Sequence, residues 1–301
     1  MDVVNSKILL NLEYPDIINA CQALPAFARV CNDPYFWDLK AEDDFGIPSS
    51  ELALVPGSSN QERYKFIYDI KDPNKGLLEA ANLGVLSLVK YFLKLGADLH
   101  AEDEFVLRLA VAKGHLGVVK YLVEQGANIH AKGELALKWA TDYNHLDVVK
   151  YLVEQGADFR IWDESILMSV AGKGHLDVVK YLVERGANFH AQNEGSLRLA
   201  ASNGHLNVVK YLVEIGADLH VRDEAALILA ANNGHLNVIK YLVEQGANLH
   251  AKDELALRWA AENGHLDVVK YLIEQGADPQ VILDDANTYK AEIANYILTF
   301  Y

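Results

Sequence analysis

The sequence is poor in cysteine, contains no long apolar run and has no excess of positive charge. Its 301 residues include two cysteines, Cys21 and Cys31, so no disulfide framework is possible and a reducing, intracellular compartment is the default. No run approaches the roughly 18 apolar residues of a membrane span. The chain also opens without the basic and apolar segments of a secretory signal. We therefore expect a soluble, cytoplasmic protein that has no membrane contact.

The formal net charge of −15 narrows the class of partner. A nucleic-acid ligand is disfavoured, because an acidic surface repels a phosphate backbone. A basic or neutral protein partner fits this charge better, although net charge informs association rates more than identity.

Signatures of catalysis are also absent. The sequence contains no nucleophile elbow, no phosphate-binding glycine loop and no cluster with metal-ligand spacing. An active site needs singular groups that converge in a pocket, whereas the carboxylates and histidines here occupy serial, equivalent positions. We expect a protein that is not an enzyme and that uses no metal or cofactor.

What the sequence has in abundance is repetition. A block that begins Gly-His-Leu and continues Val-Val-Lys-Tyr-Leu recurs every 30 residues, with seven copies between about residues 74 and 283. Two copies are degenerate, because the one at Gly84 lacks the histidine and the one at Asn144 lacks the glycine. The other copies begin at Gly114, Gly174, Gly204, Gly234 and Gly264.

Each copy is predicted to form two helices. In the last copy the first helix starts at Asp253, whose carboxylate can cap the free amides of the first turn, and it buries Leu257 and Ala260. The second helix runs from about Leu266 to Gln275, and Gly276 follows as its C-terminal stop. Two such short helices cannot bury their apolar faces alone. Stacking of neighbouring copies therefore builds one continuous core.

This pattern resembles the ankyrin repeat, with its two-alanine first helix, Gly-His junction, valine–leucine second helix and closing Gly-Ala. The family repeat has about 33 residues, whereas here three are missing between Ala251 and Leu257, where the family carries its hairpin finger. Leu255-Ala256-Leu257-Arg258 replaces the family's Thr-Pro-Leu-His tetrapeptide. The resemblance implies an all-α, ankyrin-type α-solenoid of seven helix-pair repeats, with shortened fingers and first helices that start earlier. The array is most similar to the 30-residue ankyrin arrays of giant DNA viruses of amoebae, which implies the host cytoplasm.

All eleven histidines fall in two columns of the repeat. Neighbouring members of a column are expected to lie one repeat apart, about 10 Å, whereas zinc ligands lie about 2 Å from the metal. We therefore predict structural hydrogen bonds for both columns. Hydroxylation of the second column is an alternative, since ankyrin repeats resemble known substrates of an intracellular asparagine/histidine hydroxylase. The first column is His115, His145, His175, His205, His235 and His265; the second is His100, His130, His190, His220 and His250.

Two further columns are predicted to be structural. A tyrosine column on the second helices should pack between layers, and a glutamate column should open each first helix, where the helix dipole favours it. The glutamates could also form an acidic rim beside the binding face. The columns are Tyr91, Tyr121, Tyr151, Tyr181, Tyr211, Tyr241 and Tyr271, and Glu104, Glu134, Glu164, Glu194, Glu224 and Glu254.

Function is expected where the repeats differ. The two positions before the junction glycine vary, and in ankyrin proteins the matching positions face the concave groove. Neutral drift would produce the same variation. Exposed aromatic and arginine side chains are the usual binding hot spots, and the third and fourth repeats are the most unusual in this respect. The predicted partner-binding residues are Lys113, Lys138, Trp139, Asp142, Tyr143, Trp162, Lys173, Asn203, Asn233 and Asn263.

Residues 1–46 do not follow the repeat and resemble the F-box, a helical module that ties substrate receptors to a cullin-type ubiquitin ligase. The family's initial Leu-Pro and much of its first helix are missing. The alternative is that these helices only cap the array. The matches are Leu9, Leu10, Leu12, Pro15, Asp16, Ile17, Cys21, Phe27, Cys31, Asp33, Pro34, Trp37, Phe45 and Gly46. The resemblance implies contact with a Skp-type adaptor through Leu9, Leu12, Pro15, Ile17 and Trp37.

The predicted organisation has four parts. Residues 1–46 form the F-box-like module, and residues 47–73 form a linker and an N-terminal capping helix. Residues 74–283 form the seven repeats, and residues 284–301 form a C-terminal capping helix. Two functions remain open for this expected monomer, a substrate receptor of a ubiquitin ligase and a plain scaffold or sequestering decoy.

Overall fold

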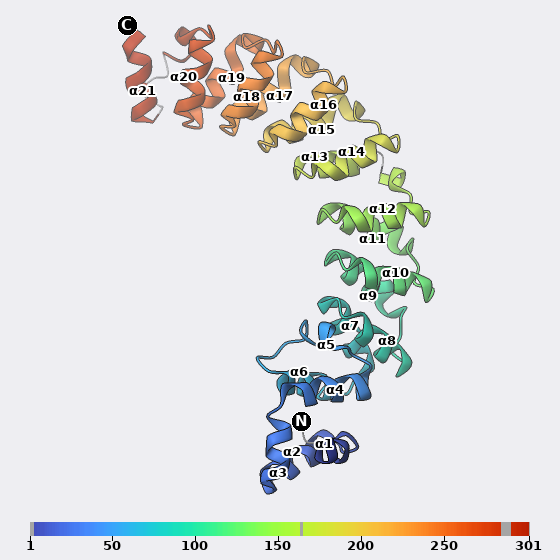
Figure 1. Ribbon diagram of the computed structural model, residues 1–301. Coiled ribbons are helices and arrows are strands. Elements are labelled where there is room, and N and C mark those ends of the chain that lie inside the picture. The colour runs from blue at the N-terminus through green and yellow to red at the C-terminus, as the bar shows by residue number, and fades with distance from the viewer. Residues whose placement is uncertain (1–2, 163–164, 284–289, 301) are drawn as a thin grey trace. The chain divides into compact units, whose positions relative to one another are not determined.

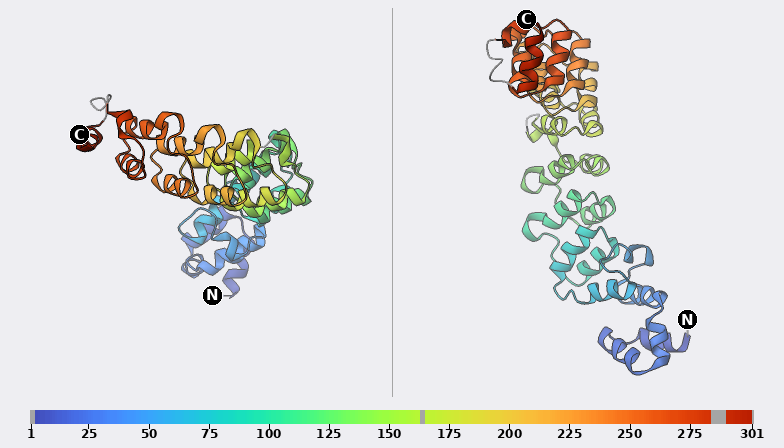
Figure 2. Two further views of the ribbon diagram at one scale, coloured as in Figure 1. Left: turned by 90° about the horizontal axis from the view of Figure 1, so that it is seen from above. Right: turned by 90° about the vertical axis from the view of Figure 1, so that its left-hand side faces the viewer.

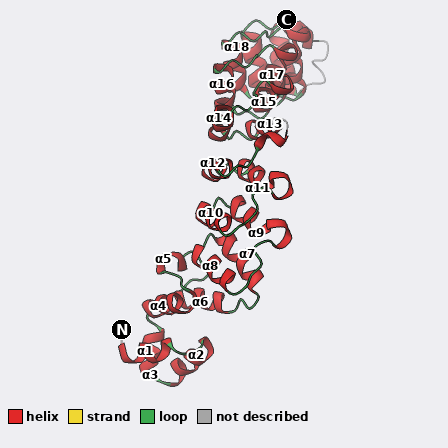
Figure 3. Cartoon of the chain, turned by 90° about the vertical axis from the view of Figure 1, so that its right-hand side faces the viewer, coloured by secondary structure: helices red, strands yellow, loops and turns green. Residues whose placement is uncertain are grey.

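The computed structural model describes residues 3–162, 165–283 and 290–300. Within these ranges the regular structure is helical and includes no strand (Figure 3). The chain divides into two compact units, residues 1–158 and 159–301, which appear in blue to green and in yellow to red (Figures 1 and 2). The prediction of an all-α fold is confirmed. No helix in the described ranges is both long and apolar enough to cross a bilayer.

The first unit begins with a small helical module. Prolines occupy the first turn of three of its helices, where the missing N–H costs no hydrogen bond. Leu9, Ile17, Phe36 and Trp37 are fully buried and form its core. The helices are α1 (Val3–Leu10), α2 (Tyr14–Ala23), α3 (Pro25–Cys31) and α4 (Pro34–Phe45).

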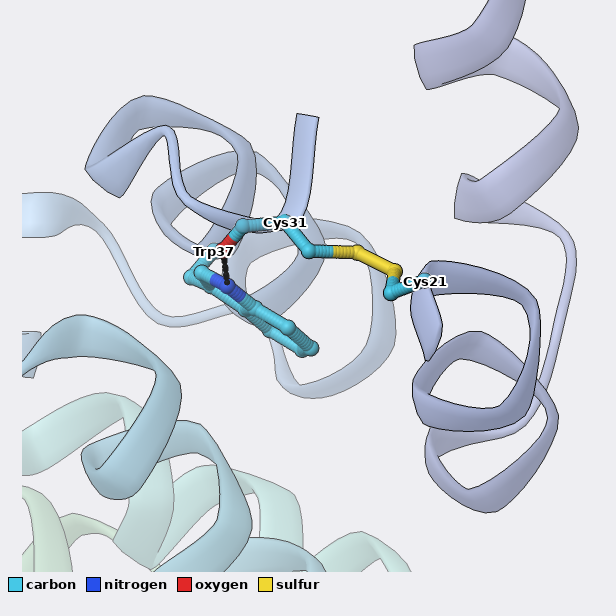
Figure 4. Close-up of a disulfide and its surroundings, with 3 residues drawn as sticks. All are labelled: Cys21, Cys31 and Trp37. Atoms are coloured by element: carbon cyan, nitrogen blue, oxygen red, sulfur yellow. Dashed lines mark hydrogen bonds between the residues drawn. A yellow bond between two sulfur atoms is a disulfide. The ribbon is translucent and has the colours of Figure 1, made fainter. Parts of the chain in front are cut away.

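A disulfide joins α2 to α3 through Cys21 and Cys31 (Figure 4). Their Cα atoms lie 6.3 Å apart, within the span that such a bond accommodates. The Cys31 carbonyl also accepts a hydrogen bond of 2.8 Å from Nε1 of Trp37. The sequence did not predict this bond, because only the packing of α2 against α3 brings the two residues together. The reduced state assumed for the two thiols is therefore not the state of the structure.

The segment predicted to be a linker is folded. Ile47, Leu52 and Val55 are buried, and α5 (Ser49–Leu52) and α6 (Asn60–Tyr68) pack with α4. The structure therefore contradicts a linker in residues 47–73, although α6 does serve as the expected helix in front of the repeats. The polar residues of this stretch suggested a linker, but Ile47, Leu52 and Val55 are buried, whereas Leu54 is exposed.

A buried polar network connects α6 to the N-terminal module. Lys40 is 3% exposed, and its Nζ donates to Oδ1 of Asp44 at 2.8 Å and to the Leu10 carbonyl at 2.7 Å. The hydroxyl of Tyr64 on α6 donates to the other oxygen of Asp44. Burial and this carboxylate raise the pKa of Tyr64 far above its ordinary value. The buried lysine is tolerated because Asp44 compensates its charge.

Three repeats complete the first unit. First helices pack on first helices and second helices on second helices, and the first helices make the closer contacts (Figure 1). The closer row is the inner side of a curved stack. The helix pairs are α7 (Pro73–Leu83) with α8 (Leu86–Lys94), α9 (Ala101–Ala112) with α10 (Leu116–Glu124), and α11 (Ala131–Asp142) with α12 (Leu146–Glu154).

The second unit contains four more helix pairs, so the predicted seven pairs are confirmed. Its pairs are α13 (Ser165–Gly172) with α14 (Leu176–Glu184), α15 (Ala191–Ser202) with α16 (Leu206–Glu214), α17 (Val221–Asn232) with α18 (Leu236–Glu244), and α19 (Ala251–Glu262) with α20 (Leu266–Glu274). The 3-10 turns η1 (Phe159–Trp162) and η2 (Pro279–Ile282) lie at the two ends. Helix α21 (Ala291–Ile297), followed by η4 (Leu298–Phe300), packs on α20 and buries Ile293 and Ile297. Of the residues predicted to form the C-terminal cap, 284–289 and 301 lie outside the described ranges.

A left-handed turn stands where the family carries its finger. Lys252, Asp253 and Glu254 have φ of 53°, 55° and 61°, so the right-handed part of α19 begins only after them. Asp253 therefore does not cap the helix as predicted. Helix α19 as a whole starts early, as expected, but its right-handed part starts after Glu254. A left-handed turn costs roughly 1–2 kcal/mol per residue, so neighbouring contacts must offset it. The same turn occurs at 102–104, 132–134, 192–194 and 222–224.

Candidate functional site

The structure brings together the predicted binding residues of the first unit. Lys113 follows α9 as its C-cap and is exposed, and the others lie on or directly after α11. Nζ of Lys138 lies 2.6 Å from Oδ2 of Asp142 one turn later, so these two charges neutralise each other. Tyr143 is 59% exposed and stacks on the His145 ring. We call Lys113, Lys138, Trp139, Asp142 and Tyr143 the inner patch.

Arg108 adjoins the inner patch and was missed by the sequence predictions. Its guanidinium carbon lies 5.6 Å from the centre of the half-buried Trp139 ring and 5.6 Å from that of Phe105. Its Nη2 donates to the Glu102 carbonyl at 3.1 Å. Arg108 stands one repeat before Lys138, so its place in the repeat matches that of a predicted binding residue.

The predicted binding asparagines of the second unit tie repeats together. Nδ2 of Asn203 donates to the Gly172 carbonyl at 2.6 Å, and Nδ2 of Asn233 donates to the Ser202 carbonyl at 2.9 Å. Asn263 continues the pattern with a bond of 3.0 Å to Oδ1 of Asn232. These amides are exposed, but they already make hydrogen bonds between repeats. Their positions repeat because of this structural role, which weakens the case for direct partner contact.

The other two predicted residues of this unit lie apart from each other. Lys173 is exposed directly after α13, at the same repeat position as Lys113. Trp162 lies in η1, before the first helix of its repeat, and is half-buried. Trp162 therefore does not share a helix end with the lysine and asparagine positions.

The first histidine column has the predicted structural role. Nε2 of His145 lies 2.9 Å from the Ala112 carbonyl oxygen, and the same bond recurs from His115, His205, His235 and His265 at 2.9–3.1 Å. Each ring therefore links its repeat to the one before.

The second histidine column pairs with the glutamate column. Nδ1 of each histidine lies 2.5–2.6 Å from Oε1 of the glutamate four residues later, as for His220 and Glu224. The five described glutamates are only 4–6% exposed, so the expected acidic rim is wrong, and Glu164 lies outside the described ranges. Hydrogen bonding to the carboxylate raises the pKa of His100 and His220. Structural hydrogen bonds are thus confirmed here too.

The glutamates also help to fix the left-handed turns. Oε1 of Glu194 accepts from the Asp218 amide at 3.2 Å, and Oε1 of Glu254 accepts from the Asp278 amide at 3.3 Å. Each of these two carboxylates thus connects its own histidine to the backbone that follows the second helix of the same pair. Among the described residues, no three His, Cys, Asp or Glu side chains gather closely enough to hold a metal ion.

The tyrosine column lies on the outer helices. In five cases Nζ of the lysine of one repeat lies over the tyrosine ring of the next, as for Lys240 and Tyr271 at 5.6 Å. The rings are mostly half-buried, so the predicted packing between layers is confirmed together with a cation–π contact that was not predicted.

Most of the predicted adaptor-binding residues are inside the module. Leu9 and Ile17 are 0% exposed and Trp37 is 1% exposed, so they cannot touch a partner without unfolding the core. Leu12 is half-buried and Pro15 is exposed. Three of the five predicted adaptor-binding residues thus belong to the core of the module. Of the five, only Pro15 and part of Leu12 are accessible.

Comparison with known proteins matches the repeat region. A family model described as ankyrin repeats (3 copies) matches residues 77–163, 160–223 and 197–282. Among solved structures, the chain is similar to the crystal structure of the human ASB11 ankyrin repeat domain, with 25% identity and a TM-score of 0.58. That match covers 67% of this chain and 98% of the other. A search of curated proteins finds no match.

Proposed function

Because the chain belongs to the ankyrin repeat family, we propose that it is a non-enzymatic scaffold that binds a partner protein on the inner patch. One observation carries this proposal. Tyr143 is 59% exposed beside the half-buried Trp139, at the end of a helix on the inner row. Large aromatic side chains at such positions are the usual centres of binding energy.

The arrangement of polar groups supports binding rather than catalysis. Ten histidines form one of two recurring bonds, either to a carbonyl or to a buried glutamate. Catalysis depends on distinct groups that converge on one substrate. Serial hydrogen bonds stabilise the array instead and leave the inner patch to vary.

A finer proposal concerns the N-terminal module. We propose the ubiquitin-ligase link as the second candidate, in which a Skp-type adaptor contacts the module of a monomeric, cytoplasmic receptor. Its support is limited to the F-box-like pattern and to exposed apolar side chains of the module, Ile8 at 49% and Leu24 at 51%. A deletion of residues 1–46 is a poor test, because it removes α4 from α6 and α8 and uncovers core residues. Full-length variants Ile8→Asp, Pro15→Asp and Leu24→Asp keep the core intact.

The adaptor candidate is tested by a pull-down of the full-length protein, probed for the Skp-type adaptor and cullin. Recovery that the surface variants abolish would support the ligase link. No recovery with the wild type would leave the module as a cap.

The main proposal is tested by photo-crosslinking. A benzophenone amino acid replaces Tyr143 in one protein and Gly117 in another. Gly117 is an exposed control on the outer helix α10 of the preceding repeat, and a side chain there meets no atom within 4 Å. A partner protein should crosslink from position 143 and not from position 117. Equal crosslinking from both positions, or none from position 143, would reject the inner patch.

A further inference from the structure

Arg108 is a buried cation that has no acidic partner among the described residues. The residue is 5% exposed, and its Nε and Nη1 atoms are buried with no hydrogen-bond partner in the described part of the chain. A guanidinium carries five N–H donors, and within the described ranges Arg108 makes one hydrogen bond, from Nη2 to a carbonyl. A buried charge with unused donors is costly unless something compensates it. A functional role is one reason why a protein retains such a buried guanidinium.

The surroundings of Arg108 compensate its charge only in part. The rings of Phe105 and Trp139 each lie 5.6 Å from the guanidinium carbon, and a cation over an aromatic face is modestly stabilised. Aromatic faces do not satisfy N–H donors in the plane of the group. The planar fork of a guanidinium suits a carboxylate.

The equivalent arginines of other repeats lack this property. Arg198 donates through Nε to the Asn193 carbonyl and through Nη2 to the Gln192 carbonyl, both at 3.0 Å. Arg258 donates through Nε to the Asp253 carbonyl at 3.0 Å. Both are half-buried and use Nε on the carbonyls of the left-handed turn. Arg108 stands at the same position but leaves its Nε unused, so turn stabilisation alone does not explain it.

We propose that the inner patch binds an acidic segment of the partner protein, whose carboxylate pairs with Arg108. This inference rests on the proposed function and names the chemistry of the partner. The Trp139 ring over the guanidinium moves aside to admit the carboxylate, and Tyr143 contacts an apolar side chain of the same segment. Lys113 adds an exposed positive charge, while Lys138 is already neutralised by Asp142.

Local charge here opposes the charge of the whole chain. The net charge of −15 predicts a basic or neutral partner and repels acidic peptides at a distance. Pairing with a desolvated guanidinium is a short-range interaction, which added salt screens less than it screens the distant repulsion. Binding of an acidic peptide should therefore persist or strengthen with moderate salt. Binding driven by attraction between distant charges would instead weaken as salt is added.

The test uses the full-length protein and fluorescence anisotropy. One probe is a fluorescein-labelled peptide that alternates glutamate and leucine, and a matched probe carries lysine in place of glutamate. A single-stranded thymidine oligonucleotide serves as a third probe. The acidic peptide should bind the wild type most tightly. Arg108→Met should weaken it about ten-fold, the effect of losing a charged hydrogen bond, and the control Arg258→Met should leave it unchanged.

Several outcomes would overturn the inference. They are tighter binding of the lysine peptide or the oligonucleotide, no binding of the acidic peptide, or equal binding by wild type and Arg108→Met. Should Arg108→Met fail to fold, Arg108→Lys keeps the charge without the planar fork, and wild-type affinity in that variant would also overturn the proposal. A failed acidic peptide with successful crosslinking from position 143 rejects only the partner chemistry. Failed crosslinking rejects the proposed function itself.

Discussion

Gly114 and His145 fit together because the glycine has no side chain. A Cβ on Gly114 would lie 2.5 Å from Nδ1 of His145, whose Nε2 is held 2.9 Å from the Ala112 carbonyl. The ring therefore fills the space that the glycine leaves in the preceding repeat. The same relationship links Gly84 to His115, Gly174 to His205, Gly204 to His235 and Gly234 to His265. The Gly-His junction is thus a contact between repeats as well as a turn.

The first prediction concerns this contact. Gly114→Ala should lower the free energy of unfolding by about 1–3 kcal/mol more than Gly46→Ala, because overpacking is added to the backbone strain. The two glycines have similar φ, 74° and 68°, and a Cβ at Gly46 meets nothing within 4 Å. Urea unfolding of both variants gives the comparison. Equal losses would mean that backbone conformation alone selects the junction glycine.

The sequence predicted the repeat number, the helix pairs and the buried columns, because a strict period reveals which positions share an environment. It did not predict the left-handed turns. Three consecutive residues with positive φ are unfavourable locally, as at Asp253 and Glu254, so local propensity favoured an N-cap and a right-handed helix. The structure instead shows a tertiary contact at this turn, in which the backbone amide of Asp278, after α20, donates to Glu254. Such tertiary contacts leave no local signal.

The candidate site was predicted only in part, for a related reason. Variation at the positions before the glycine led to Tyr143, which is exposed. The same criterion selected Asn233, whose amide bonds to the neighbouring repeat, and missed Arg108, whose unused donors appear only once its burial is known. A sequence column shows that a position is special but not whether its side chain faces a repeat or a partner.

The second prediction separates these roles for Asn233. Asn233→Ala should lower the free energy of unfolding by about 1 kcal/mol, since its Nδ2 bonds to the carbonyl and the hydroxyl of Ser202. Asn237→Ala is the matched control, because Asn237 is exposed on α18 and makes no side-chain hydrogen bond within the described residues. Thermal unfolding followed by circular dichroism measures both. An Asn233→Ala protein as stable as the control would restore the asparagines as candidates for partner contact.

The third prediction concerns the disulfide. Reduction of the Cys21–Cys31 bond should destabilise the N-terminal module by about 3 kcal/mol, because the bond closes a short loop in the unfolded chain. Trp37 reports on this region, since its Nε1 donates to the Cys31 carbonyl. Urea unfolding followed by tryptophan fluorescence, with and without dithiothreitol, gives the difference. A Cys21→Ser variant should not respond to the reductant, and two alkylated thiols in the unreduced, denatured wild type would contradict the bond.

The last prediction concerns pH and the pair of His220 and Glu224. The hydrogen bond to the carboxylate raises the pKa of His220 in the folded protein, with Asp218 contributing. A raised folded pKa stabilises the protein below the unfolded value of about 6.5, and this stabilisation is lost as the pH rises through the folded pKa. Stability should therefore increase as the pH falls from about 8 to about 6.5, before carboxylates begin to protonate. His100, whose pKa is raised by Glu104, acts in the same direction.

The test compares wild type with His220→Gln by urea unfolding across this pH range. Glutamine can still donate a hydrogen bond to Glu224 but cannot gain a proton, so the variant should show a smaller increase in stability between pH 8 and about 6.5. The charge on His220 is largely exposed, and solvent screening keeps its contribution modest. The double variant His100→Gln with His220→Gln should flatten the curve further, since the two pairs lie in different units and their effects should add. A full wild-type slope in the double variant would show that these pairs are equally protonated in the folded and unfolded chains.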